Sequence, residues 1–210
     1  MANVLDYLRV LRRAYTVPPE TKDGLTLYRE EIDGHRAFFI PGTRLCLADI
    51  MDDISFFPSL TRRLGVVPRG FYQATRDLIA ERIWWPEIAN SVIVGHSLGG
   101  AVALMLAALG VHRNARPALV LTFGAPRVGF RKISNLLSRV FVIQYKLGND
   151  PVPDLPPLYQ HPTRLIHLGG PCIDPFECHK LGSYIRFFEN NSNYGKFMVD
   201  WALDNDELEA

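Results

Sequence analysis

The sequence has few cysteines, little net charge and no long uninterrupted apolar segment. Its 210 residues include three cysteines and carry a formal net charge of +1. A nearly neutral chain lacks the basic surface that nucleic acids select, so no nucleic-acid partner is expected. No apolar run reaches the roughly 18 residues of a membrane-spanning helix, so no transmembrane segment is expected. Hydrophobic residues still make up 48% of the chain, enough for the core of one domain over residues 1–210.

The three cysteines are Cys46, Cys172 and Cys178, and an odd number does not make a disulfide framework. The spacing of Cys172 and Cys178 is consistent with a disulfide, and equally with two buried or free thiols. No cluster of cysteine and histidine has the spacing of a zinc site. We therefore expect neither a metal ion nor another cofactor.

The N-terminal residues predict an amphipathic helix rather than a signal peptide. Val4, Leu5, Leu8 and Leu11 recur near helical spacing, and charged residues occupy the other faces. Neither an uninterrupted apolar segment nor a small-residue cleavage site follows them. The expected location is cytoplasmic by default, or outside the cell after removal of a signal.

Alternating strand and helix patterns predict an α/β fold. Asp33-Gly34 is a hairpin turn signal between two strand-like runs. The expected strands are Leu25–Glu31, His35–Ile40, Val92–Val94, Ala118–Phe123, Val140–Tyr145 and Arg164–Leu168. The expected helices are Leu45–Ile54, Phe71–Ile83, Leu98–Leu109, Phe130–Leu137 and His179–Phe188. Alternation in the second half implies crossover connections and a mostly parallel sheet with helices on both faces.

The segment that best indicates chemistry is Gly95-His96-Ser97-Leu98-Gly99, between an apolar strand and an Ala- and Leu-rich helix. This is the layout of a nucleophile elbow, G-x-S-x-G. The strand and helix approach closely there, so a side chain at Gly95 or Gly99 would clash. The strained turn exposes the hydroxyl of Ser97, which we interpret as a nucleophile. A Ser in an ordinary strand-to-helix turn is the alternative.

A serine hydroxyl needs a base to take its proton, and the base needs a group that orients it. The acid is expected after the serine, at the carboxyl end of a strand. Asp150 meets this condition because it directly follows the strand that ends near Tyr145. Asp154 and Asp174 are the competing carboxylates.

The base is expected last in the chain, and His179 is the candidate. His161 precedes a proline in a loop, and His167 lies inside the expected strand Arg164–Leu168, where we expect it to pack in or beside the core. His96 is next to the serine, but an elbow would turn it elsewhere, which favours a structural role.

The developing oxyanion needs hydrogen-bond donors. One is expected to be the backbone N–H of Leu98, at the start of the helix after the elbow. The other is expected at Thr43, whose hydroxyl can donate alongside its N–H, although a turn threonine that bonds its own backbone is the alternative.

An ordered set of motifs runs through most of the chain, from about His35 to Tyr184. The set comprises Pro41-Gly42-Thr43, Gly70-Phe71, Gly95-His96-Ser97-Leu98-Gly99-Gly100-Ala101, Thr122-Phe123-Gly124-Ala125-Pro126-Arg127-Val128-Gly129, Asp150-Pro151-Val152-Pro153 with Leu155-Pro156-Pro157, and His179 with Tyr184. In this order the motifs resemble those of the class 3 lipases, the family of the filamentous-fungal triacylglycerol lipases. Pro41, Pro68 and Phe130 depart from the residues common in that family, although none of them replaces a catalytic group.

The resemblance implies an α/β-hydrolase fold with Ser97 as nucleophile, Asp150 as acid and His179 as base. It also implies an oxyanion hole formed by Thr43 and Leu98. The segment from Arg44 to Phe57 lies where the family carries a lid that opens at lipid surfaces, and a fixed helix packed on the core is the alternative. The lid and acyl-binding candidates are Leu45, Ile50, Met51, Ile54 and Phe57.

The predicted function is a serine carboxylester hydrolase that acts on acyl glycerides or fatty esters through an acyl-enzyme. The expected partners are an ester or lipid substrate and, peripherally, lipid surfaces. An A-type phospholipase or another lipid esterase would use the same three residues. A hydrolase-like scaffold that binds lipid or a partner without turnover is the alternative from another class, and a peptidase or thioesterase fits the motifs least.

Overall fold

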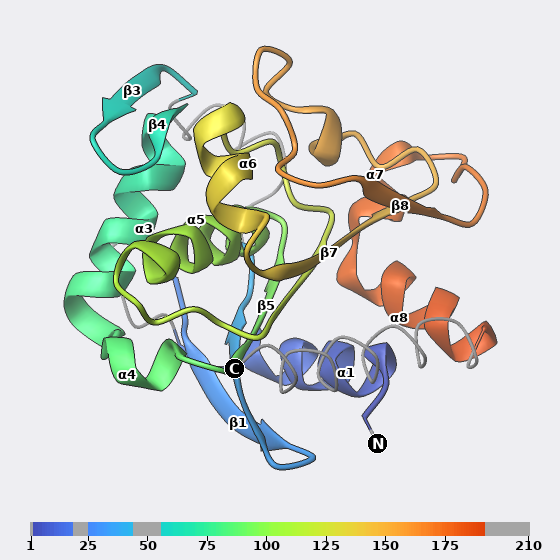
Figure 1. Cartoon of the computed structure of the whole chain (residues 1–210). Coiled ribbons are helices and arrows are strands. Elements are labelled where there is room, and N and C mark those ends of the chain that lie inside the picture. The colour runs from blue at the N-terminus through green and yellow to red at the C-terminus, as the bar shows by residue number, and fades with distance from the viewer. Residues whose placement is uncertain (1, 19–24, 44–55, 192–210) are drawn as a thin grey trace.

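The computed structural model of the chain describes residues 2–18, 25–43 and 56–191. Among these residues, a six-stranded sheet has the strand order β1-β2-β5-β6-β7-β8 (Figure 1). Its strands are β1 (Tyr28–Ile32), β2 (His35–Ile40), β5 (Val92–His96), β6 (Leu119–Phe123), β7 (Phe141–Leu147) and β8 (Leu165–Leu168). Only β1 is antiparallel to its neighbour, so the predicted mostly parallel sheet is confirmed.

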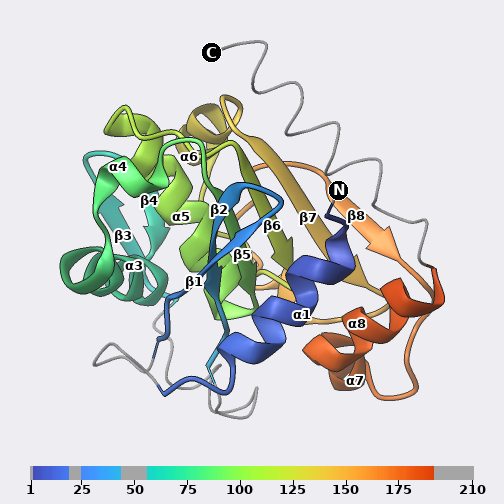
Figure 2. The ribbon, with the colours of Figure 1, turned by 90° about the horizontal axis from the view of Figure 1, so that it is seen from below.

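Helices cover both faces of this sheet (Figures 1 and 2). One face carries α1 (Val4–Ala14), α7 (Pro175–His179) and α8 (Leu181–Asn190). The other carries α3 (Arg69–Arg82), α4 (Trp85–Ile88), α5 (Leu98–His112) and α6 (Arg131–Leu137). No helix in the described part of the chain is both long and apolar enough to cross a bilayer.

The central strand β5 and the helix after it are buried almost throughout their length. Every residue of β5 is buried, and α5 is buried from Leu98 to Val111. Alternate strand residues reach opposite layers: Ile93 packs towards α5, whereas Val92 and Val94 belong to the core under α1 and α8. A helix that is apolar on all sides needs such surroundings, and its first turn is thereby held rigidly at the end of β5.

The hairpin turn at Asp33-Gly34 is confirmed, and both residues have positive φ, 49° and 79°. The sequence did not predict the second, two-stranded sheet, formed by β3 (Pro58–Thr61) and β4 (Gly65–Pro68). It also predicted one helix over His179–Phe188, whereas the chain forms two helices there. The break falls at Lys180, whose backbone is extended (φ −62°, ψ 133°), so that His179 ends one helix just before the next begins.

Candidate active site

Ser97 occupies a strained turn at the end of β5. Its φ of 55° and ψ of −129° lie in a region that non-glycine residues seldom adopt. A Cβ at Gly99 would lie 2.0 Å from the carbonyl oxygen of Ile40, and one at Gly95 would lie 2.4 Å from the carbonyl oxygen of Gly99. The predicted clash at both glycines is therefore real, and the tight packing holds Ser97 in this conformation.

Ser97, His179 and Asp150 form a continuous hydrogen-bonded chain. The Ser97 hydroxyl lies 2.9 Å from His179 Nε2, and His179 Nδ1 lies 3.0 Å from both carboxylate oxygens of Asp150. An ionised carboxylate only accepts, so Nδ1 carries the proton and Nε2 is left to accept from the serine. The three residues are 3%, 8% and 0% exposed, respectively. This arrangement allows an imidazole to take a hydroxyl proton.

Further donors fix the Asp150 carboxylate. The backbone N–H of Val152 donates to Oδ1 at 3.0 Å, and the Tyr184 hydroxyl donates to Oδ2 at 2.8 Å. The same hydroxyl accepts from the backbone N–H of Leu147 at 3.1 Å. Burial, with a contribution from Asp150, raises the pKa of Tyr184 well above its usual value, so the phenol keeps the proton that it donates.

Gly124 leaves the space in which the side chains of Asp150 and His179 meet. Its φ is +60°, and a Cβ there would lie 2.8 Å from Asp150 Oδ2 and 3.0 Å from His179 Nδ1. From the sequence, Gly124 was named only as part of a motif. Its contact with two side chains far along the chain depends on the tertiary fold.

The two expected oxyanion donors, Leu98 and Thr43, directly follow Ser97 and Gly42 in the chain. Leu98 is the first residue of α5, where backbone N–H groups have no partner within the helix. Thr43 Oγ1 is buried and has no hydrogen-bond partner among residues 2–18, 25–43 and 56–191. The loop before it touches the serine, since a Cβ at Gly42 would lie 2.8 Å from Ser97 Cβ. A buried hydroxyl without a partner is costly, and a developing oxyanion would satisfy it.

The competing acids and histidines have other partners. Asp154 accepts from Lys146 at 2.6 Å, and Asp174 caps α7 by accepting from the Phe176 N–H at 3.0 Å. His161 Nε2 donates to the carbonyl oxygen of Pro153 at 2.6 Å. The prediction that His167 packs in or beside the core is wrong. It is exposed on β8, because its alternating position faces solvent.

Cys172 and Cys178 form a disulfide next to this site. Asn149 holds the same loop, because its side chain accepts from the Cys172 N–H at 2.9 Å and donates to the Cys172 carbonyl at 3.1 Å. Asn149 precedes Asp150, and Cys178 precedes His179. The cross-linked loop therefore connects the backbone next to Asp150 with the backbone next to His179.

Most of the expected lid lies outside the described residues, including Leu45, Ile50, Met51 and Ile54. Phe57, the remaining candidate, is described and is 76% exposed. The preceding Phe56 packs edge-on against Phe71 of α3, with ring centroids 5.8 Å apart. A lid motion therefore stays a prediction.

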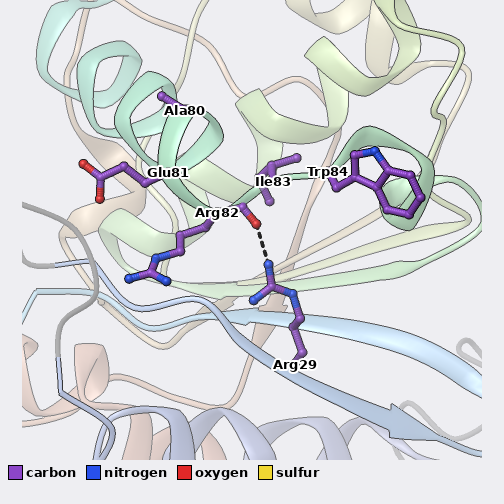
Figure 3. A pocket seen from close by; sticks show the side chains of 6 residues that line it. All are labelled: Arg29, Ala80, Glu81, Arg82, Ile83 and Trp84. Atoms are coloured by element: carbon purple, nitrogen blue, oxygen red, sulfur yellow. Dashed lines mark hydrogen bonds between the residues drawn. The ribbon is translucent and has the colours of Figure 1, made fainter.

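A hollow of about 340 Å³ lies apart from Ser97, His179 and Asp150 (Figure 3). It is lined by Arg29, Ala80, Glu81, Arg82, Ile83 and Trp84. Arg29 of β1 lines it and donates to the carbonyl oxygen of Arg82 at the end of α3. The same guanidinium lies 3.7 Å from the carboxylate of Glu87. The lining residues do not include Ser97, His179 or Asp150, so the hollow is separate from the site around Ser97.

Comparisons with known proteins identify the fold and the family of the chain. The chain superposes on the crystal structure of Lip2 lipase from Yarrowia lipolytica with a TM-score of 0.59, at 20% sequence identity over 81% of this chain and 79% of that one. That likeness identifies the fold as that of an α/β-hydrolase. The family model of class 3 lipases matches residues 46–160, more than half of the chain. The chain therefore belongs to the class 3 lipase family.

Two curated relatives cover smaller parts of the chain. A secreted mono- and diacylglycerol lipase from Fusarium solani is 39% identical over 88 residues, which are 40% of this chain and 26% of that protein. The triacylglycerol lipase OBL1 of Arabidopsis thaliana is 33% identical over 123 residues, 52% of this chain and 23% of the relative. The chain thus spans about a quarter of the length of these relatives.

Proposed function

We propose that this protein is a serine carboxylester hydrolase acting on acyl glycerides or fatty esters. The observation that carries the proposal is the buried hydrogen-bonded chain from Ser97 through His179 to Asp150, with the serine held in a strained turn. Family membership and the acylglycerol substrates in the names of the relatives support the same class of substrate.

The reaction has two halves. Ser97 Oγ attacks the ester carbonyl while His179 Nε2 takes the hydroxyl proton, and Asp150 stabilises the resulting imidazolium. The backbone N–H of Leu98 and the hydroxyl and N–H of Thr43 would bind the oxyanion, each donor contributing roughly 3–4 kcal/mol. The C–O bond to the alcohol then breaks, and the alcohol takes the proton from His179. Water, activated by the same imidazole, attacks the acyl-enzyme and releases the acid.

The test is the substitution Ser97→Ala, assayed with p-nitrophenyl esters and with a serine-directed fluorophosphonate probe. We expect the folded variant to lose hydrolysis and labelling together, whereas wild type labels at Ser97. Wild-type turnover by folded Ser97→Ala would contradict the proposal. Absence of labelling in the wild type would favour a binding scaffold instead.

A substrate panel then separates the lipid classes. Monoacyl, diacyl and triacyl glycerides are compared with phospholipids of the same acyl chain, with and without emulsified lipid. We expect glycerides to be cleaved faster than phospholipids. The reverse preference would identify an A-type phospholipase that uses the same three residues.

A further inference from the structure

His96, the residue before the proposed nucleophile, has both ring nitrogens engaged away from the serine. Its Nε2 lies 2.8 Å from the backbone carbonyl oxygen of His179, and its Nδ1 lies 2.5 Å from the Tyr15 hydroxyl. Its ring stacks on that of His179, with centroids 5.0 Å apart and planes inclined by 28°. His96 is buried, and Tyr15 is the C-cap residue of α1. The two partners therefore come from distant parts of the chain.

Every proton in this cluster can be assigned from its chemistry. A carbonyl oxygen only accepts, so His96 Nε2 carries a proton. Burial lowers the pKa of His96 to about 3, so the ring is neutral and Nδ1 is an acceptor. Tyr15 must then donate its hydroxyl proton to Nδ1, and its oxygen accepts from the backbone N–H of Gly42 at 2.7 Å. Burial raises the pKa of Tyr15, which keeps the phenol protonated.

The cluster joins the two halves of the proposed site. At one end it holds Gly42, the residue before Thr43. A Cβ added at Gly42 would lie 2.9 Å from the Tyr15 oxygen and 2.8 Å from Ser97 Cβ. At the other end it holds the carbonyl of His179, at the break between α7 and α8. One neutral hydroxyl–imidazole pair thus connects the oxyanion side with the base.

We propose that Tyr15 and His96 are positioning residues that keep the Gly42–Thr43 loop and the backbone of His179 in register around Ser97. The inference rests on the proposed ester hydrolysis, because the positions of the Gly42–Thr43 loop and of His179 relative to Ser97 matter when an oxyanion forms. A displacement of about 1 Å in such a site costs on the order of 100-fold in rate. Neither residue exchanges a proton with the substrate, since both ring nitrogens and the phenol are already bonded.

The first test is Tyr15→Phe, which removes the hydroxyl and keeps the ring. We expect kcat for a soluble p-nitrophenyl ester to fall roughly 10- to 100-fold, with KM changed by less than about threefold, because the loss falls on the transition state. Tyr28→Phe is the matched control, since Tyr28 is a half-buried tyrosine of β1 whose ring packs against Phe39. Assays are run well below each variant's melting temperature. A purely structural hydroxyl would lower Tm and leave kcat unchanged, which would overturn the inference.

The second test is a double-mutant cycle with His96→Gln. A glutamine amide can still donate towards the carbonyl of His179 but offers no ring nitrogen to Tyr15. Because both single substitutions break the same hydroxyl–imidazole bond, the double variant should lose no more than about threefold in kcat beyond the worse single variant. Multiplicative losses would show that the two residues act independently and would overturn the inference.

A third measurement needs only the wild-type protein and covers the case in which a variant fails to fold. Nitrogen-15 NMR of the histidine rings should find His96 neutral and protonated on Nε2 from pH 8 to about pH 5. A proton on Nδ1, or a ring that titrates near pH 6.5, would overturn the inference. Wild type that neither cleaves esters nor labels at Ser97 would overturn the proposed function as well. An active wild type with an unimpaired Tyr15→Phe variant would overturn this inference alone.

Discussion

Two sides of the site are built on different electrostatics. On the acid side, the carboxylate of Asp150 accepts from His179, from a backbone N–H and from Tyr184. On the oxyanion side, Gly42 is held by the neutral pair of Tyr15 and His96. Both sides use a buried tyrosine hydroxyl that also accepts from a backbone N–H. Hydrogen bonds to a charged group are roughly twice as strong as neutral ones, so the acid side should be the costlier one to disturb.

The largest expected effect is on the acid side, for Asp150→Asn. An asparagine amide favours the wrong tautomer of His179, so kcat should fall roughly 10⁴-fold. Asp174→Asn is the control, because asparagine caps a helix as well as aspartate does and Asp174 only caps α7. Steady-state kinetics with a p-nitrophenyl ester measures both. A loss below tenfold in folded Asp150→Asn would remove Asp150 from the role of acid.

Gly124→Ala tests whether the contact between acid and base needs the open space beside it. The added methyl group would lie 2.8 Å from Asp150 Oδ2, on a backbone at φ +60°. We expect kcat to fall about 100-fold and the free energy of unfolding to fall by roughly 1 kcal/mol. Gly182→Ala is the matched control, since nothing lies within 4 Å of its Cβ position. Unchanged kcat in Gly124→Ala would mean that the two side chains shift at no catalytic cost.

A comparison of Tyr184→Phe with Tyr15→Phe tests directly which side of the site contributes more to the free energy of unfolding. Tyr184→Phe leaves Asp150 one donor short and the buried N–H of Leu147 without its partner, which should cost about 1–3 kcal/mol of unfolding free energy. Tyr15→Phe breaks bonds between neutral groups and should cost less. Urea denaturation at pH 7 measures both, with Tyr28→Phe as reference. A larger stability loss for Tyr15→Phe would reverse the assignment of the charged side as the costlier one.

An expected effect of similar size is a pH dependence of stability that belongs to the oxyanion side. Burial lowers the pKa of His96 from 6.5 to about 3, so the unfolded chain binds more protons between these values. The contribution of His96 to stability is therefore complete above pH 6.5 and falls as the pH drops, by about 2.5 kcal/mol between pH 7 and pH 4.5. The wild type should lose that much more than His96→Gln between pH 7 and pH 4.5 in urea titrations. Parallel losses in the two proteins would show that His96 is not held neutral.

Much of the candidate site could be predicted from local sequence pattern. The Gly-x-Ser-x-Gly segment predicted the strained turn at Ser97, because its glycines and flanking elements act within a few residues of one another. Chain order then selected Asp150 and His179, and the hydrogen bonds join the same pair. Local sequence pattern gave poorer predictions where tertiary packing decides the local structure. It predicted a buried His167 that is exposed, and it missed the β3–β4 hairpin and the helix break at Lys180.

The sequence by itself determined the alternation of strands and helices, the turn at Ser97 and the chain order of Ser97, Asp150 and His179. These depend on backbone preferences and apolar periodicity, which act over short distances along the chain. Only the tertiary structure decided which buried groups complete the site. Tyr15 meets His96 across 81 residues and Gly42 across 27, and Gly124 meets Asp150 and His179 through space. Such contacts arise because burial forces polar atoms to find partners wherever the fold places them, and no local pattern records where that will be.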